Sequence, residues 1–275
     1  MRTKRLLLLG LALATTTFLH AQTDVDLDPE FGARLSAEVN KKLTKGLHLK
    51  AEEEMRLTDN FSSLGRLQST LGITYKLHPN IKAGLGYALI NPYSAANNSF
   101  KDTRHRLMVD LTGSYKYGRW TFSLKERFQA TYRTGDMNEY QNPRTALTIK
   151  SRLKAQYRLS ASLTPYAAVE LRHMLNAPAI TALTDGTNWF TSDGDDEGTA
   201  GWFISGWNKA YLNRIRATLG MSIRFDKHNT LNVYVMADRI SDLVVDANKK
   251  GTKLKDYTRE TGFVGQVVAA YTYSF

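Results

Sequence analysis

The sequence predicts an all-β protein, an antiparallel up-and-down transmembrane β-barrel of about 12 strands, with 10 as the alternative. Three observations predict this fold. Segments of roughly ten residues alternate apolar and polar side chains along most of the chain. Short turns alternate with long polar loops, and no apolar run beyond the N-terminus approaches the roughly 20 residues that a membrane helix needs. A soluble β-sandwich or lipocalin-like barrel is the less favoured alternative, because the polar faces carry too much charge for a dry interior.

Residues 1–22 have the pattern of a cleaved secretory signal peptide. Met1–Arg5 is basic, Leu6–Leu19 is apolar but too short to span a bilayer, and Ala21 is a suitable last residue before cleavage. Residues 23–275 are then expected to form one barrel domain. The chain contains no cysteine, which excludes a disulfide framework, a thiol nucleophile and an acylated lipoprotein anchor.

The segment after Arg144 shows the alternation most clearly. Ile149 and Leu153 fall on one face, whereas Lys150, Arg152 and Lys154 fall on the other. Those cations must meet water, so their face is expected to line an aqueous lumen while the apolar face contacts lipid. The other alternating segments are Phe31–Leu43, Leu47–Leu57, Arg66–Leu77, Ile81–Ile90, Arg104–Tyr117, Trp120–Arg133, Leu163–Asn176, Leu212–Phe225, Asn229–Ile240 and Phe263–Phe275.

The connections differ between the two ends of the predicted barrel. Tight turns are expected at Thr44–Gly46, His78–Asn80, Gly118–Arg119, Ser160–Ser162 and Asp226–Asn229. Long extracellular loops are expected at 91–103, 134–143, 177–210 and 241–262. An aromatic girdle is expected beside the short periplasmic turns, formed by Tyr75, Tyr115, Tyr117, Trp120, Tyr157, Phe225, Tyr271, Tyr273 and Phe275.

Two features depart from the simple pattern. Glu53 and Glu126 fall on the lipid-facing side in mid-strand, which indicates a bulge, a protonated or snorkelling carboxylate, or a local slip of register. The alternating segments number about eleven, so an even barrel requires one strand more or one fewer. Residues 22–30 are the candidate for the additional strand.

The last segment resembles the C-terminal insertion signal of Gram-negative outer-membrane proteins, with Tyr271, Tyr273 and the terminal Phe275 at alternate positions. That resemblance implies recognition by the barrel assembly machinery. Residues 38–57 (EVNKKLTKGLHLKAEEEMRL) and 71–90 (LGITYKLHPNIKAGLGYALI) are similar to a family of outer-membrane β-barrels of unknown function. The resemblance implies the fold and an outer-membrane location, and the family offers no catalytic residues to transfer.

The inward face of the predicted barrel is strongly cationic, with a surplus of roughly fifteen positive charges. The candidate anion-binding residues are Arg106, Lys125, Arg127, Lys150, Arg152, Lys154, Arg172, Arg214 and Arg216. The candidate ion-pair network comprises Glu52, Glu54, Arg56, Asp110, Glu170 and Asp238. Further inward cations are Arg34, Lys42, Lys50, Arg66, Lys76, Lys82, Arg104, Lys116, Arg133, Arg158 and Arg224.

Three functions are compatible with this lumen. The first is a narrow channel or ligand-binding pore that prefers an anionic small solute, because rings of Arg and Lys favour anions. The second is a closed barrel, filled by a rigid charge network, that acts through its long extracellular loops. The third is an interfacial lipid-modifying enzyme with His105 or His173 as its base. The sequence carries no G-x-S-x-G, P-loop, dinucleotide or H-E-x-x-H motif, so we predict no enzyme activity, no catalytic residue, no metal site and no cofactor.

The expected partners are outer-membrane lipid and lipopolysaccharide, the barrel assembly machinery during insertion and an anionic solute. Nucleic acid is not expected, because no helix-turn-helix, zinc-finger or RNA-binding pattern accompanies the basic charge. The acidic stretch Asp185–Glu197 is open to three interpretations. It is a solvated loop, a plug that folds into the cationic mouth, or a divalent-ion site that bridges lipopolysaccharide.

Overall fold

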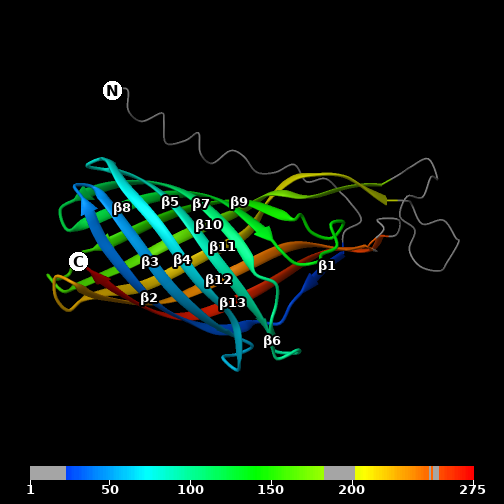
Figure 1. The fold of residues 1–275 in the computed structure, drawn as a ribbon, viewed down its shortest axis with the longest axis horizontal. Helices are drawn as coiled ribbons and strands as arrows, with labels where there is room; N and C mark the ends of the chain where they lie inside the picture. The colour runs from blue at the N-terminus through cyan, green and yellow to red at the C-terminus, as the bar shows by residue number, and fades with distance from the viewer. Residues whose placement is uncertain (1–22, 183–201, 248, 250–253) are drawn as a thin grey trace, which may run out of the picture.

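The structure is a computed structural model that describes residues 23–182, 202–247, 249 and 254–275, and Figure 1 shows that its strands wrap into a closed barrel. Eleven strands form the wall, and each is hydrogen-bonded to its neighbour in sequence order, with the last returning to the first. They are β2 (Glu30–Thr44), β3 (Leu47–Thr58), β4 (Ser63–His78), β5 (Ile81–Ser94), β7 (Arg104–Tyr117), β8 (Trp120–Arg133), β9 (Thr145–Tyr157), β10 (Leu163–Ala182), β11 (Trp202–Arg224), β12 (Asn229–Ala247) and β13 (Leu254–Ser274). No helix in the described part of the chain is long and apolar enough to cross a membrane.

The fold class is confirmed, but the wall has eleven strands instead of the expected twelve or ten. In an up-and-down barrel an odd number makes the first and last strands run in the same direction, and β2 does pair with β13 in parallel. The expected additional strand is only the short β1 (Thr23–Asp26), which pairs in parallel with β13 beyond the start of β2. β1 and then β2 therefore pair with successive parts of the same edge of β13, and β1 adds no further strand to the wall. The short β6 (Ser99–Phe100) pairs only with β5.

The five predicted tight turns are confirmed by the strand boundaries. The predicted loops at 91–103, 177–210 and 241–262 are partly wrong. β5 continues to Ser94 and β6 follows, β10 continues to Ala182, β11 begins at Trp202, β12 continues to Ala247 and β13 begins at Leu254. The alternation is lost there although pairing continues. The β10–β11 register shifts on both sides of Ala177 and again at Ala179, beside Pro178, which has no N–H to donate to the ladder.

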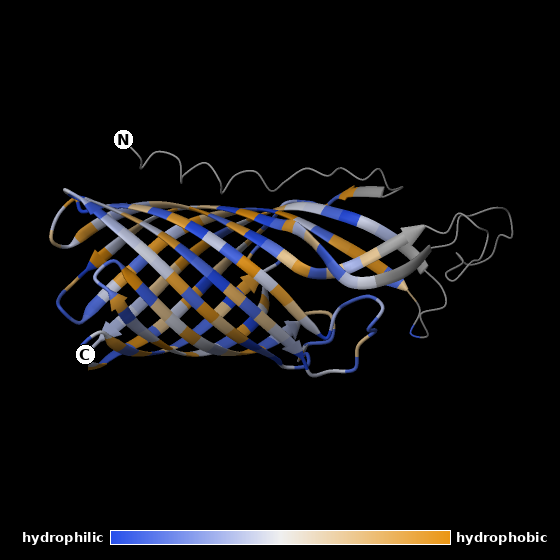
Figure 2. Cartoon of the chain, turned by 90° about the horizontal axis from the view of Figure 1, so that it is seen from above, coloured by the Kyte–Doolittle hydropathy of each residue, from blue (hydrophilic) through white to orange (hydrophobic). Residues whose placement is uncertain are grey.

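The outer wall is apolar over most of its height. Leu71, Leu124 and Leu219 lie on the well-separated strands β4, β8 and β11, and each residue is 50–65% exposed. Figure 2 shows apolar and polar bands alternating along the strands over the wall. Exposure of this kind on all sides is stable only against lipid, so this barrel is a transmembrane one.

Aromatic side chains gather at the short-turn end of the wall, as predicted. Tyr115 and Tyr117 are exposed at the end of β7, and the Trp120 ring lies 4.9 Å from that of Tyr157 between centroids. Tyr273 and Phe275 pack 5.7 Å apart at the end of β13. Their amphipathic or flat rings suit the boundary between hydrocarbon and headgroups.

The two outward carboxylates are accommodated without a bulge. Ser69 Oγ donates a hydrogen bond to Glu53 Oε2 at 2.8 Å, and Ser151 Oγ donates one to Glu126 Oε2 at 2.6 Å. In both cases the serine stands directly opposite the glutamate on the next strand, with unbroken register. A bulge or slip of register is therefore excluded at both positions, and each carboxylate has a polar neighbour within the wall.

Candidate functional site: a cationic chamber in the lumen

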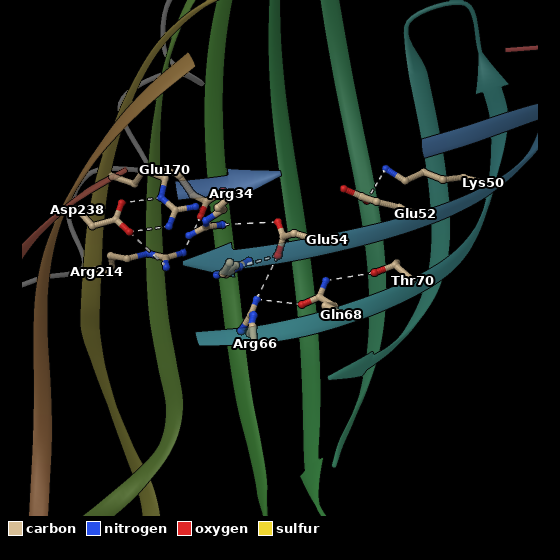
Figure 3. A network of polar contacts seen from close by, with 12 residues as sticks. Arg34, Lys50, Glu52, Glu54, Arg66, Gln68, Thr70, Glu170, Arg214 and Asp238 are labelled. Carbon is tan, nitrogen blue, oxygen red and sulfur yellow. Dashed lines mark hydrogen bonds and ion pairs between the residues drawn. The ribbon is translucent and has the colours of Figure 1, made fainter. Parts of the chain in front are cut away.

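The polar faces of the strands point into the barrel, and two clusters of ion pairs in the lumen form what we call the ion-paired belt. One cluster is Arg34, Glu54, Arg56 and Arg66 on β2 to β4, and the other is Glu170, Arg214, Arg216 and Asp238 on β10 to β12 (Figure 3). Alternation alone brings these side chains together, because each lies on the inward parity of its strand.

One carboxylate holds three arginines on the β2–β4 side of the belt. Glu54 lies 2.6 Å from Arg56, 3.7 Å from Arg66 and 4.0 Å from Arg34, measured between oxygen and nitrogen atoms. Gln68 adds a side-chain oxygen 2.9 Å from Arg66 Nη2. Three cations that stand opposite one another in the sheet would repel, and the shared carboxylate offsets that repulsion.

The β10–β12 side of the belt is more tightly packed. Arg216 donates two hydrogen bonds of 2.6 Å to the oxygens of Asp238, whose residue is only 2% exposed. Arg214 donates to Glu170 at 3.0 Å and lies 3.7 Å from Asp238. Planar guanidinium groups facing carboxylates in this way form the strongest class of charged hydrogen bond.

Between the belt and the long loops lies a chamber of about 480 Å³. Ten basic side chains line it, together with two acidic ones, Asp242 and Glu260. The basic residues are Arg34, Arg56, Arg66, Arg104, Arg106, Arg133, Lys150, Arg172, Arg214 and Arg216.

Half of these cations lack a carboxylate partner. Among the described residues, the belt carboxylates pair with Arg34, Arg56, Arg66, Arg214 and Arg216, but no carboxylate lies within 4.0 Å of Arg104, Arg106, Arg133, Lys150 or Arg172. Arg106 donates from Nε to Thr131 Oγ1 at 3.0 Å. The Nε atoms of Arg133 and Arg172 are buried and have no hydrogen-bond partner in the described structure.

These five residues, which we call the unpaired cations, share one wall. They come from β7, β8, β9 and β10, which are consecutive in the sheet. Arg104 stands directly opposite Arg133, and Lys150 stands directly opposite Arg172. Like charges in such positions destabilise a sheet unless a counter-ion or water lies between them.

The deep pair belongs to a longer row of cations. Arg127, Lys150, Arg172 and Arg214 are successive register partners across β8, β9, β10 and β11. The two ends of this row are neutralised, since Arg127 binds Asp110 through two hydrogen bonds of 2.6 and 2.7 Å and Arg214 binds Glu170. Positive charge is therefore left at the centre of the row, where Lys150 and Arg172 face the chamber.

Residues 134–144, between β8 and β9, form a strap across the mouth of the chamber. Asn138 Nδ2 donates to the Ala247 carbonyl at 2.6 Å, and Gln141 Nε2 donates to Asp246 Oδ1 at 2.8 Å. Both acceptors lie at the end of β12, which is separated from β9 in the sheet by two strands. The strap residues Gln141, Asn142 and Pro143 line the chamber, so the strap narrows its outer opening.

The structure divides the predicted anion-binding residues between two levels. Arg106, Lys150, Arg172, Arg214 and Arg216 line the chamber. Lys125, Arg127, Arg152 and Lys154 lie on β8 and β9 outside its lining. Arg127 is the register partner of Lys150, and the other three are nearer the short turns.

The lower lumen is also supplied with counter-charges. Lys125 lies 2.8 Å from Asp110, and Lys154 stands 3.8 Å above the centre of the Tyr166 ring. In the predicted ion-pair network, Glu52 binds Lys50 at 3.1 Å, and Lys50 also contacts Glu38. Glu54, Arg56, Glu170 and Asp238 take part in the belt, and Asp110 pairs with Lys125 and Arg127.

Sequence reasoning identified Arg104 and Arg133 as inward but did not single them out. Nothing in their spacing says that they lack partners, because pairing depends on which side chains meet across strands. The strap was missed entirely, since residues 134–143 were expected to be an outer loop, and their amides give no periodic signal.

Other surfaces are less suited to bind a polar solute. Two hollows of about 750 Å³ each lie on the lipid-facing wall over β9 to β13, and their lining is almost wholly apolar. His105 faces outward, with its Nδ1 2.6 Å from the Tyr87 hydroxyl. The described residues contain no group of three or more His, Asp or Glu side chains that could hold a metal ion. The signal peptide 1–22 and the acidic stretch Asp185–Glu197 lie outside the described residues.

Comparison with known proteins agrees with the family resemblance seen in the sequence. Residues 31–192 match the model of a family described as "Protein of unknown function (DUF2490)". No curated protein matches the chain.

Solved outer-membrane barrels are similar in fold only. Outer-membrane expressed OmpT of Vibrio cholerae shows 9% identity and a TM-score of 0.35, and the alignment covers 78% of this chain and 57% of the OmpT chain. The anion-selective porin from Comamonas acidovorans shows 12% identity and a TM-score of 0.32, covering 82% of this chain and 53% of its own. The siderophore receptor PirA from Pseudomonas aeruginosa shows 10% identity and a TM-score of 0.20, with 82% and 55% covered. This chain thus spans little more than half the length of these barrels.

Proposed function

This chain belongs to the DUF2490 family, and from its geometry we propose that it is an outer-membrane β-barrel whose lumen admits and binds anionic small solutes. The apolar outer wall, the predicted signal peptide and the aromatic C-terminus support the outer-membrane location. We propose outer-membrane lipid with lipopolysaccharide as its surroundings, and the barrel assembly machinery as the partner that reads Tyr271, Tyr273 and Phe275.

The observation that carries the proposal is the wall of unpaired cations. At an effective dielectric constant of about 20, two like charges about 5 Å apart repel by about 3 kcal/mol. Arg104 with Arg133 and Lys150 with Arg172 are like charges that stand directly opposite each other in the sheet, where repulsion of this kind is expected. An anion bound between the members of each pair relieves this repulsion, so the chamber favours anions over cations.

Single-channel recording in planar bilayers under a salt gradient tests the proposal. We expect a reversal potential of the sign that indicates anion preference, and a shift toward zero in the double variant Lys150→Gln/Arg172→Gln. Lys227→Gln is the control, because Lys227 is an exposed cation in the β11–β12 turn, far from the chamber lining. Cation selectivity of the native barrel, or an equal shift in the control, contradicts the proposal.

The ion-paired belt favours a second candidate function. Asp238, Arg214 and Arg216 are buried within the lumen, which indicates that the belt obstructs passage through the barrel. A barrel of this kind holds its solute in the outer chamber and acts as a closed, surface-interacting protein. Saturable anion binding without any measurable conductance favours this second function over a channel.

That the chain is not an enzyme stays a prediction. Among the described residues the His105 side chain hydrogen-bonds only to the Tyr87 hydroxyl, and this contact lacks the carboxylate of a nucleophile-base-carboxylate triad. Assay of the purified protein with phospholipid and lipopolysaccharide as substrates tests it, and turnover of either one contradicts it.

A further inference from the structure

We propose that the chamber is built for an elongated solute that carries several anionic groups, a short linear oligoanion, and this inference rests on the proposed function above. A simple anion site needs one cluster of donors. Here the unpaired cations are spread from the mouth of the chamber to its floor, as the register of the strands establishes.

The cations form a ladder along one wall. Arg104 and Arg133 stand opposite each other at the mouth, where β7 begins and β8 ends. Arg106 follows two residues further down β7, on the same face. Lys150 and Arg172 form the deep end, beside the belt. The charges of Arg104 and Arg172 both act on that of Arg106, so Arg106 connects the two ends.

The ladder is too long for a single small anion to contact all of its cations at once. The register partner of Lys150 on β8 is Arg127, six residues from Arg133, which is about 20 Å along the strand. One phosphate or sulfate group spans only a few ångströms and can engage one end at a time. A solute with anionic groups on successive units can engage both ends together, and the second contact then gains from the first.

The opposite wall indicates how such a solute lies. Asp242 and Glu260 face the chamber from β12 and β13, directly opposite each other in the sheet, and they disfavour anionic groups on that side. The lining also includes apolar side chains, Met174 on β10 and Leu243 and Val244 on β12. Anionic groups therefore face β7 to β10, while the carbon skeleton of the solute contacts the apolar part of the lining. The volume of about 480 Å³ is in the range of pockets that enclose drug-sized ligands.

Calorimetric titration of the purified full-length barrel in detergent tests the ladder with two probe series. Inorganic phosphate is compared with linear tripolyphosphate, and galacturonate with trigalacturonate, each at equal concentration of anionic groups. In at least one series we expect the trimer to bind at least tenfold more tightly than the monomer. The series with the greater advantage distinguishes a phosphate chain from an acidic sugar chain.

Single variants at the two ends distinguish binding along the ladder from non-specific attraction of anions to a cationic lumen. Arg133→Gln and Lys150→Gln should each bring the affinity for the trimer to within about threefold of the monomer. Lys154→Gln removes a lumen cation that does not line the chamber, and it should leave the advantage of the trimer unchanged. Arg133 and Lys150 each stand opposite another cation and have no carboxylate within 4.0 Å among the described residues, so their replacement should not lower the thermal stability of the barrel.

Three results overturn the inference. They are equal affinity for trimer and monomer in both series, a loss in Lys154→Gln as large as in Lys150→Gln, and an absence of binding of any probe. If the native barrel still shows anion-selective currents in those cases, the proposed function stands and only the oligoanion inference fails. Cation selectivity together with an absence of binding overturns both.

Discussion

A single carboxylate, Asp238, illustrates how individual residues set the properties of the lumen. It accepts both hydrogen bonds of the Arg216 guanidinium and lies near Arg214, in a setting almost inaccessible to water. A buried ion pair adds little net stability over an apolar pair, but breaking one leaves the remaining charge without compensation. Removal of one acidic group from the belt is therefore expected to lower the free energy of unfolding much more than removal of an exposed acidic group.

We predict that Asp238→Asn lowers the free energy of unfolding by about 3–5 kcal/mol, because Arg216 is left buried without its counter-charge. Urea-induced unfolding in lipid vesicles, followed by tryptophan fluorescence, measures the change. The matched control is Glu139→Gln, which breaks the exposed pair with Arg144 at 3.2 Å. That control should change the free energy of unfolding by only about 0–1 kcal/mol. Similar losses in the two variants contradict the assignment of the belt as buried.

The residue scale also marks the limit of what the sequence could predict. Alternation placed Lys150, Arg172 and Asp238 in the lumen correctly, because the direction of a side chain follows from its position along the strand. It could not predict that Asp238 neutralises Arg216 while no carboxylate lies within 4.0 Å of Lys150 among the described residues. Pairing depends on strand register across the sheet, which a single sequence does not contain.

At the scale of elements, the strap is the part of the chain most suited to control access. Its hydrogen bonds to the end of β12 come from two side-chain amides. In the described part of the chain no backbone hydrogen bond between the strap and β12 adds to them. The exposed contact between Asp136 and Lys249 adds little, since surface ion pairs contribute about 0–1 kcal/mol. Few interactions therefore hold the strap over the chamber.

We predict that Asn138→Ala/Gln141→Ala releases the strap and widens the outer opening. Faster association of the anionic probes with the chamber, or larger single-channel conductance, is the expected result. Stopped-flow mixing and bilayer recording measure these two quantities. Ser62→Ala is a suitable control, because Ser62 lies in the β3–β4 turn at the same end and its hydroxyl binds only the local Asp59 carbonyl. Unchanged association and conductance in the double variant would show that the strap does not limit access.

Strand ends were the elements that sequence patterns predicted least well. Segments at 163–176 and 212–225 were recognised where one face meets lipid, but their continuations in β10 and β11 were expected to be loop. Above the bilayer both faces of a strand are in water, so the apolar-polar alternation disappears although the backbone ladder continues. Pattern analysis therefore detects the height of the membrane more directly than the length of the strand.

At the scale of the whole molecule, the eleven-stranded closure decides where the chain starts and finishes. The β13–β2 pairing is parallel, so β2 begins at the long-loop end of the barrel and β13 finishes at the short-turn end (Figure 1). An even-stranded barrel, which the sequence had favoured, places both at the same end. The difference rests on one strand: an additional strand 22–30 would place Val25 in the half of the wall near the short turns, whereas in the structure Val25 lies at the long-loop end.

Labelling of introduced cysteines distinguishes the two topologies, and the native chain has no cysteine to interfere. We predict that a membrane-impermeant maleimide applied to intact cells reacts with Val25→Cys and not with Lys227→Cys, which lies in a short turn. Lys101→Cys, between β6 and β7, is the positive control for the long-loop side. Protection of Val25→Cys together with Lys227→Cys would support an even number of strands.

The parallel closure also restricts how this protein can be re-engineered. In a barrel whose two ends meet at one rim, a peptide of a few residues suffices to join them and allows new ends to be opened elsewhere. Here eleven residues of β13 separate the partner of Glu30 from Phe275, a span of about 35 Å along the wall. Circular permutation of this chain would require a linker that threads the bilayer, so its natural ends cannot simply be exchanged for others.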